Sequence, residues 1–224
     1  MALERLDLEH VPPTYQIYTA LFRDVANTEF LHKQLLSRNT DFQYAFIDAS
    51  SVISRLHLLS AVYSAVNALL DGTLRTPNVH SEMVVSFNIN NNVCPLPILL
   101  HHLPNPPNPH QIADAYRRWG ITPGKTKDLV VVKVVLPPSA TQDGTATQAQ
   151  THTERTIWEH LTQHVQGTPA PLTDDNLAKT TDWPKVRKYY RLNGVAALER
   201  AADEEERRRQ SERLAIMGMA LRGL

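Results

Sequence analysis

Residues 120–126 have the composition of a phosphate-binding loop, with two glycines followed by Lys125 and Thr126. A phosphate loop separates its two glycines by four residues and joins a strand to a helix, so that backbone N–H groups surround the phosphates. Here only three residues separate Gly120 from Gly124, and the segment precedes an apolar run typical of a strand. The sequence therefore favours an ordinary turn.

His160 and His164 stand four residues apart on a predicted helix, a spacing that allows adjacent turns to share a metal ion. The zinc-protease pattern places Glu directly after the first His, whereas Glu159 comes before it, and no third ligand is evident. We favour two histidines at the exposed edge of a helix. A small metal hydrolase is the alternative, and it predicts bound metal in the purified protein.

Cys94 is the single cysteine, so the chain has no internal disulfide and no multi-cysteine zinc site. Nothing around it indicates a helix start or an electropositive pocket, which are the settings that lower the pKa of a thiol. We therefore expect a passive thiol, no catalytic residue, no metal and no cofactor. The sequence predicts a protein that is not an enzyme.

Residues 185–191 read KVRKYYR, in which four basic side chains alternate with two tyrosines. Such a patch can neutralise phosphates and stack the bases of single-stranded RNA. A second basic spot lies directly before Trp119. The predicted RNA-contacting residues are Lys185, Arg187, Lys188, Arg191, Arg117 and Arg118. For residues 185–191 we favour a solvated helix or strand edge with inward-packed tyrosines, and RNA binding is the alternative. For Arg117 and Arg118 a solvated helix face explains the pattern equally well.

The composition indicates an ordinary globular chain without a strong electrostatic field. Of the 224 residues, 42% are hydrophobic and 21% charged, and 23 Lys and Arg balance 23 Asp and Glu. Any contact with nucleic acid must therefore come from a local patch. No apolar run approaches the roughly 20 residues of a membrane span, and the first residues lack the apolar core of a signal peptide. We expect a nuclear or cytosolic protein.

The elements that must position these residues centre on residues 48–92, which we predict to form a helix, a turn and a strand. The helix should begin at Ser50 or Ser51 and stop at Asp71 and Gly72. Apolar residues recur at alternating steps of four and three and so mark one face. That predicted face comprises Val52, Leu56, Leu59, Tyr63, Val66 and Leu70.

The remaining pattern predicts an α/β or α+β fold, with a single central mixed sheet of about four strands and helices packed on it. The predicted strands are residues 15–25, 42–47, 80–89 and 128–136, the last of them central because its apolar run is nearly unbroken. A first helix is predicted to begin at Asn27 or Thr28. Further helices are predicted at residues 112–119 and 156–165, and a turn at 174–178. We expect one domain over residues 1–224, with a proline-rich inserted loop at 93–110 and a disordered loop at 139–153.

A long C-terminal helix is predicted from about Val195 towards Leu224. Its first half pairs acidic residues with arginines four positions later, which is typical of a solvated helix. Beyond Arg213 the residues are mostly apolar, with two methionines at 217 and 219. An apolar chain end of this kind packs either on its own core or on another protein.

Several segments together resemble one family. They are YQIYTALFRDV at 15–25, SRLHLL at 54–59, LRTPNVHSE at 74–82, NNN at 90–92, AYRRWGI at 115–121, DLVVVKVV at 128–135 and MALRGL at 219–224. In this order they are similar to the kinase-binding subunit of the KEOPS (EKC) complex, the TPRKB-like family, in a fungal style. The insertion at 93–110 departs from the family, which joins NNN closely to the following helix.

The resemblance implies an α/β fold, no catalytic activity, and binding to the small atypical kinase/ATPase of the complex. It further implies a part in threonylcarbamoyladenosine modification of tRNA position 37, contact with the tRNA 3′ end, and a link to telomere maintenance. The expected location is the nucleus, including chromosome ends, and also the cytoplasm. Carried over by position, the kinase interface comprises Ile216, Met217, Met219, Ala220 and Leu221, with Leu59 and Val62 as further candidates. The alternative is a stand-alone RNA-binding α/β module that uses residues 185–191.

Overall fold

The computed structural model describes residues 2–89, 109–137 and 153–221. The chain divides into two compact units, each discontinuous in sequence. The sheet unit comprises Met1–Ser50 and Gly120–Thr180, and the helical unit comprises Ser51–Trp119 and Thr181–Leu224. The single domain expected over residues 1–224 stays a prediction. So do the loops at 93–110 and 139–153, which lie outside the described residues except at their last positions.

The sheet unit contains an antiparallel sheet whose strand order is β1-β2-β4-β3, with β5 also paired to β2. Its strands are β1 (Leu3–Leu6), β2 (Gln16–Arg23), β3 (Ala45–Asp48), β4 (Leu129–Val135) and β5 (Thr168–Ala170). The predicted class and central sheet are confirmed, but the sheet is antiparallel where a mixed one was expected. Strands β1 and β5 were missed because both are short and neither alternates clearly.

The predicted central position of β4 is confirmed, since β4 pairs with β2 on one side and β3 on the other. Six of its seven residues are buried. Lys133 is the polar exception: its Nζ donates to the Gln43 carbonyl at 2.9 Å and lies 4.9 Å from the Tyr44 ring centroid. Burial lowers the pKa of this lysine to about 8.

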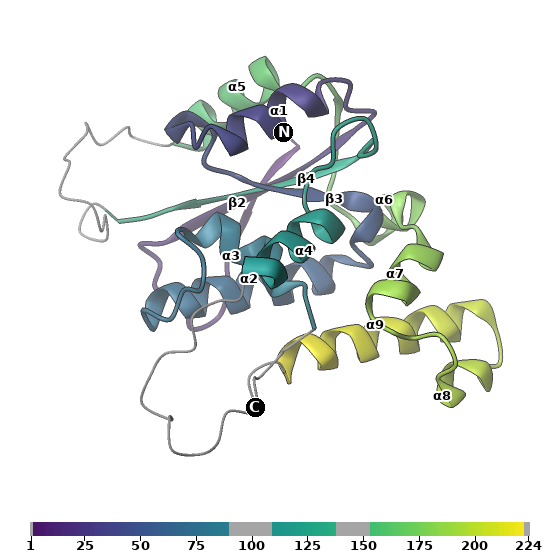
Figure 1. The fold of residues 1–224 in the computed structure, drawn as a ribbon. Coiled ribbons are helices and arrows are strands. Elements are labelled where there is room, and N and C mark those ends of the chain that lie inside the picture. Colours follow the sequence, from purple (N-terminus) through teal and green to yellow (C-terminus); the bar gives the residue numbers. More distant parts are fainter. Residues whose placement is uncertain (1, 90–108, 138–152, 222–224) are drawn as a thin grey trace. The chain divides into compact units, whose positions relative to one another are not determined.

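Helices α1 (Thr28–Leu36) and α5 (Glu154–His164) cover one face of this sheet (Figure 1). Leu31 from α1 and Ile157 and Leu161 from α5 join the aromatic core of that face. Both helices begin within two residues of the predicted positions. Asn27 precedes α1, as expected, but its side chain forms no cap and instead bonds to the His164 carbonyl and the Gln166 N–H. Asn27 therefore ties the start of α1 to the end of α5.

The strand predicted at residues 80–89 is wrong, because Val79–Ser86 form a helix, α3. Asn78 caps it by accepting a hydrogen bond from the Ser81 N–H at 2.8 Å. The fully buried Glu82 accepts from the backbone N–H groups of Arg75 and Thr76 and from both side chains. Nearly every side chain of α3 is buried, so the helical period does not show in the sequence.

The helix α2 (Arg55–Leu70) ends at Asp71 as predicted, but it starts later and buries a different face. Ser54, rather than Ser50 or Ser51, caps it by accepting from the His57 N–H at 3.0 Å. The buried face is formed by His57, Leu58, Ala61, Val62, Ala65 and Val66. Leu56, Tyr63 and Leu70 of the predicted apolar face are exposed instead.

The other helices of the helical unit are α4 (Pro109–Trp119), α7 (Trp183–Tyr189), α8 (Ala196–Glu199) and α9 (Glu204–Ala220). Helix α4 ends before Gly120 as predicted, and the long C-terminal helix is confirmed in α9. Its predicted start at Val195 is wrong, since α8 is separate and Asp203 caps α9 by accepting from the Glu206 N–H at 2.7 Å. Helix α7 was not predicted.

Smaller differences concern the sheet unit. The predicted strand at 42–47 begins only at Ala45, because Thr40–Phe42 form a 3-10 turn. The turn predicted at 174–178 is a helix, α6 (Asp174–Thr180). Within the described ranges, no helix combines the length and the apolar character needed to cross a membrane.

Candidate functional site

A groove runs between α2 and α9 in the helical unit, where the two helices contact each other. It encloses about 510 Å³. We call it the α2–α9 groove, and its lining residues are Ser60, Tyr63, Ser64, Asn67, Ala68, Asp71, Thr73, Ile216, Met219 and Ala220. The lining contains apolar and small polar side chains and a single carboxylate, a composition that suits contact with a protein surface.

Exposed apolar side chains accompany the groove on both helices. Met217 on α9 and Leu221 directly after this helix are 56% and 58% exposed, and Tyr63 and Leu70 on α2 are 37% and 36% exposed. Large apolar side chains exposed together on neighbouring elements mark an interaction surface. Among the residues that the structure describes, the helical unit therefore presents exposed apolar side chains near the groove.

The structure places the seven proposed kinase-interface residues differently. Ile216, Met219 and Ala220 line the groove, whereas Met217 and Leu221, their neighbours in sequence, are exposed but do not line it. Leu59 is half-buried, and Val62 is fully buried, so the Val62 side chain is not available at the surface. The sequence prediction named no lining residue on the α2 side of the groove; of the apolar face predicted for this helix, Tyr63 lines the groove and Leu56 and Leu70 do not.

A buried series of hydrogen bonds connects α2 with Tyr190 and with Met219, which lines the groove. The Ile53 N–H donates to His57 Nδ1 at 3.2 Å, so the ring proton resides on Nε2, which lies 2.6 Å from the Tyr190 hydroxyl. That hydroxyl donates to the Phe87 carbonyl at 3.1 Å and contacts Met219 Sδ at 3.7 Å. Burial lowers the pKa of His57 to about 3 and raises that of Tyr190, so both stay neutral.

Two further contacts hold α9 in place. The Ser54 hydroxyl at the start of α2 donates to the Glu212 carboxylate of α9. Gly218 allows a close approach, since a Cβ there would lie 3.1 Å from Ile89 Cγ2. The position of α9 is thus fixed by contacts at several points along its length, which makes the groove a preformed surface.

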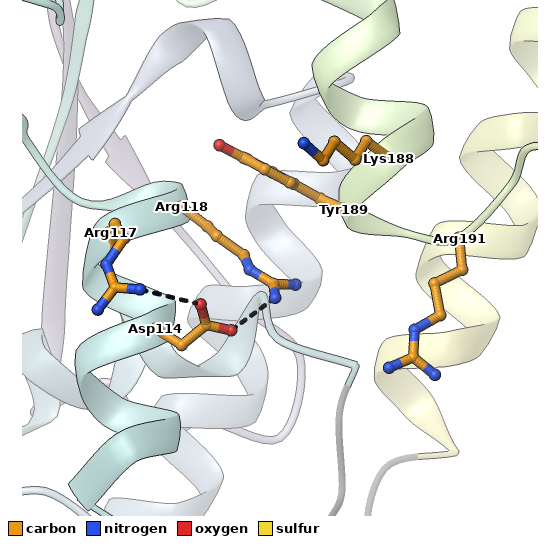
Figure 2. Close-up of a pocket in the computed structure, with 6 residues that line it drawn as sticks. All are labelled: Asp114, Arg117, Arg118, Lys188, Tyr189 and Arg191. Carbon is orange, nitrogen blue, oxygen red and sulfur yellow. Dashed lines mark ion pairs between the residues drawn. The ribbon is translucent and has the colours of Figure 1, made fainter.

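A second hollow, the basic pocket, lies between α4 and α7 in the helical unit (Figure 2). It encloses about 290 Å³, and its lining residues are Asp114, Arg117, Arg118, Lys188, Tyr189 and Arg191. The structure thus brings together Arg117, Arg118, Lys188 and Arg191 of the six predicted RNA-contacting residues. Arg187 does not line the pocket, and neither does Lys185, whose Nζ lies 5.8 Å from the Tyr189 ring centroid.

The charges of the basic pocket are arranged around one fixed arginine. Arg118 pairs with Asp114 at 2.7 Å, and its guanidinium lies 5.6 Å from the Tyr189 ring centroid and 5.8 Å from that of Trp119. Arg117 is mostly exposed and reaches Asp114 only at 4.0 Å. Lys188 and Arg191 are exposed on the opposite wall. The pocket can therefore offer several cations and an aromatic face to an anionic ligand.

The remaining candidates from the sequence are the histidine pair, the glycine-containing segment 120–126 and the single cysteine. The rings of His160 and His164 have centroids 4.5 Å apart, and His160 Nδ1 lies 2.9 Å from the Tyr44 hydroxyl. In the part of the chain that the structure describes, no three His, Cys, Asp or Glu side chains gather as metal ligands. Residues 120–126 form the expected turn, with Gly124 at a φ of 68°. Cys94 lies outside the described residues.

Comparison with known proteins relates this architecture to one family. The family model described as "Kinase binding protein CGI-121" matches residues 22–95 and 107–223. The chain is 51% identical over 226 residues to the EKC/KEOPS complex subunit cgi121 of Neurospora crassa, and 49% identical over 224 residues to the subunit of Gibberella zeae, with full coverage of both chains in each case. It is 25% identical over 181 residues to the Schizosaccharomyces pombe subunit, covering 81% of this chain and 84% of the relative.

Proposed function

Because this chain belongs to the CGI-121 family of kinase-binding proteins, we propose that it is a non-catalytic subunit of a KEOPS (EKC) complex that binds and supports the complex's atypical kinase/ATPase. Its relatives are named as EKC/KEOPS complex subunits. In this role the protein serves threonylcarbamoyladenosine modification of tRNA position 37 in the nucleus and cytoplasm, with a contribution to tRNA binding and to telomere maintenance.

The exposed apolar surface around the α2–α9 groove is the observation that carries the proposal. Met217 and Leu221 present about half of their surface to solvent at the end of a helix that is bonded to α2 through Ser54 and Glu212. A preformed apolar surface binds a partner without first paying an ordering entropy, and methionine adapts to irregular partner surfaces. The kinase is the partner class that the family description names.

The test replaces Met217 and Leu221 with Asp in the full-length chain. Both side chains are exposed, so the fold should survive, while two carboxylates at the contact should abolish co-purification with the kinase. Leu36→Asp is the matched control, because Leu36 is 72% exposed on α1, outside the groove. Unfolding curves confirm that each variant folds. Unchanged kinase binding by the double variant contradicts the proposal.

A second candidate function, RNA contact through the basic pocket, is favoured by the convergence of α4 and α7. Two segments about 70 residues apart in sequence bring four cations and Tyr189 to the lining of one pocket, with Arg118 over the Tyr189 ring. Arg117, Lys188 and Arg191 can neutralise phosphates, while Tyr189 offers a stacking face. Within the complex, the pocket would supply the subunit's share of tRNA binding. A stand-alone RNA-binding protein that uses this pocket is the alternative to the kinase-binding role.

Salt dependence tests the RNA proposal. Replacing Arg117, Lys188 and Arg191 with Gln should weaken tRNA binding and flatten the plot of log affinity against log salt by about 0.7 to 0.9 per lost phosphate contact. The control replaces Lys33, Lys125 and Lys127, which are exposed in the sheet unit, with Gln. Equal affinities and slopes for the two triple variants reject the pocket. The pocket variant should still co-purify with the kinase, which separates RNA contact from kinase docking.

A further inference from the structure

We propose that the α2–α9 groove receives one amphipathic helix of the kinase, laid along α2, with a basic side chain at the end beside Asp71. This inference rests on the proposed function, since it assumes that the kinase docks on α2 and α9. It goes further by naming the kind of element that enters the groove and the end of that element that carries a basic side chain.

The α2 wall of the groove is long enough to contact about three turns of a partner helix. This wall is formed by residues 60, 63, 64, 67, 68 and 71, which are spaced as one helical face over three turns. The eleven steps from residue 60 to residue 71, at a rise of 1.5 Å each, give a length of about 16 Å. Ser60, Ser64 and Ala68 follow at four-residue steps and leave room for a close approach, as small side chains do where helices pack about 8 Å apart.

The walls favour a helix over an extended segment because of backbone hydrogen bonding. Both walls are helices whose N–H and C=O groups are bonded within the helix, and the Ser60 hydroxyl already donates to the Leu56 carbonyl at 2.9 Å. An extended partner strand would find no backbone ladder here and would lose its own hydrogen bonds to water. A helix satisfies its backbone internally and presents only side chains.

The exposed side chains call for apolar residues along one stripe of the partner helix. Tyr63 and Leu70 stand seven residues apart on α2, and Met217 on α9 stands four residues before the C-cap Leu221, all exposed. A helix that packs against two others buries residues at positions i, i+3, i+4 and i+7. The kinase segment should therefore be amphipathic with this spacing.

Charge complementarity sets the direction of the partner. Helix α2 ends at Leu70, its last turn holds no basic residue, and Asp71 is exposed in the groove. The carbonyl end of a helix carries about half a negative charge, to which Asp71 adds a full one. Arg75, the next cation along the chain, is committed to Glu82. A Lys or Arg of the partner helix supplies the missing charge.

Site-directed photo-crosslinking measures the partner's conformation. A diazirine amino acid of about leucine size is placed in turn at Ser60, Ser64 and Ala68 of the full chain, and the crosslinked kinase residues are mapped. Positions 60 and 68 lie about 12 Å apart along α2. A bound helix shifts the crosslink by about eight kinase residues, whereas an extended segment shifts it by about four. Crosslinks at four-residue intervals, or scattered over distant kinase segments, overturn the proposal.

Charge reversal tests the basic end. We expect Asp71→Arg to weaken kinase binding about tenfold at low salt, and the loss to shrink towards twofold at high salt. Glu199→Arg, the same charge change at the exposed end of α8, should stay within about twofold of the unaltered chain. If Asp71→Arg binds as tightly as this control, the charge assignment is wrong.

The outcomes separate this inference from the proposed function. If the Met217→Asp, Leu221→Asp variant loses the kinase while the crosslinks indicate an extended or scattered contact, the docking surface stands and the partner helix is rejected. If that double variant keeps the kinase, the docking function itself fails. If the double variant loses the kinase and the crosslinks shift by about eight residues, both are supported.

Discussion

At the scale of single residues, the helical unit depends on a histidine that has no chemical task. His57 lies fully buried between the Ile53 N–H and the Tyr190 hydroxyl, and both ring nitrogens have partners. Protonation of the ring is unfavourable there, because Nδ1 must accept a hydrogen bond and full burial removes the ring from bulk solvent. This residue therefore makes the stability of the docking surface depend on pH.

The pKa of His57 is lowered to about 3 in the folded chain, below its ordinary value of 6.5. Between these values the unfolded chain binds the extra proton, so the contribution to stability is complete above pH 6.5 and is lost as the pH falls towards 3. From pH 7 to pH 5 we expect a loss of about 2 kcal/mol from this group, measured by urea unfolding. His57→Gln, which keeps a donor and an acceptor, should lack this component. Parallel pH profiles for the two proteins contradict the assignment.

At the scale of elements, the sequence predicted two kinds correctly: helices that are buried on one side only, and strands that are apolar along their whole length. Helix α4 and strand β4 were located to within three residues, since Gly120 ends the former and the latter is a compact apolar run. Helix α3 was misread because burial on all sides hides its period. The face of α2 was misassigned because α2 is apolar around most of its circumference, and periodicity alone cannot tell which side faces the core.

The candidate site was predictable in part for the same reason. The apolar end of α9 stands out in sequence after a charged stretch, so Met217 and Leu221 were found. The opposing wall of the groove includes Ser60, Ser64 and Ala68, whose small side chains give no sequence signal and gain meaning only beside α9. Likewise, the two basic spots were visible separately, but only the packing of α4 near α7 forms one pocket from them.

At the scale of the whole molecule, charge balance and the exposed apolar groove act together. The chain has 23 Lys and Arg, 23 Asp and Glu, and a sequence pI of about 7.2, so near neutral pH no net repulsion keeps copies apart. An unpartnered apolar surface then favours self-association. Such behaviour is expected of a subunit whose surface is complete only when its partner is bound.

We therefore expect the isolated chain to self-associate near pH 7.2 at micromolar concentrations, as measured by sedimentation velocity. The Met217→Asp, Leu221→Asp variant should remain monomeric, because it removes apolar surface and adds two negative charges. Gln163→Glu with Asn193→Asp adds the same charge at two exposed polar positions and leaves the groove intact. If this control is equally monomeric, net charge alone governs association. If it self-associates while the groove variant does not, the groove is the adhesive surface, and saturating kinase should suppress association of the unaltered chain for the same reason.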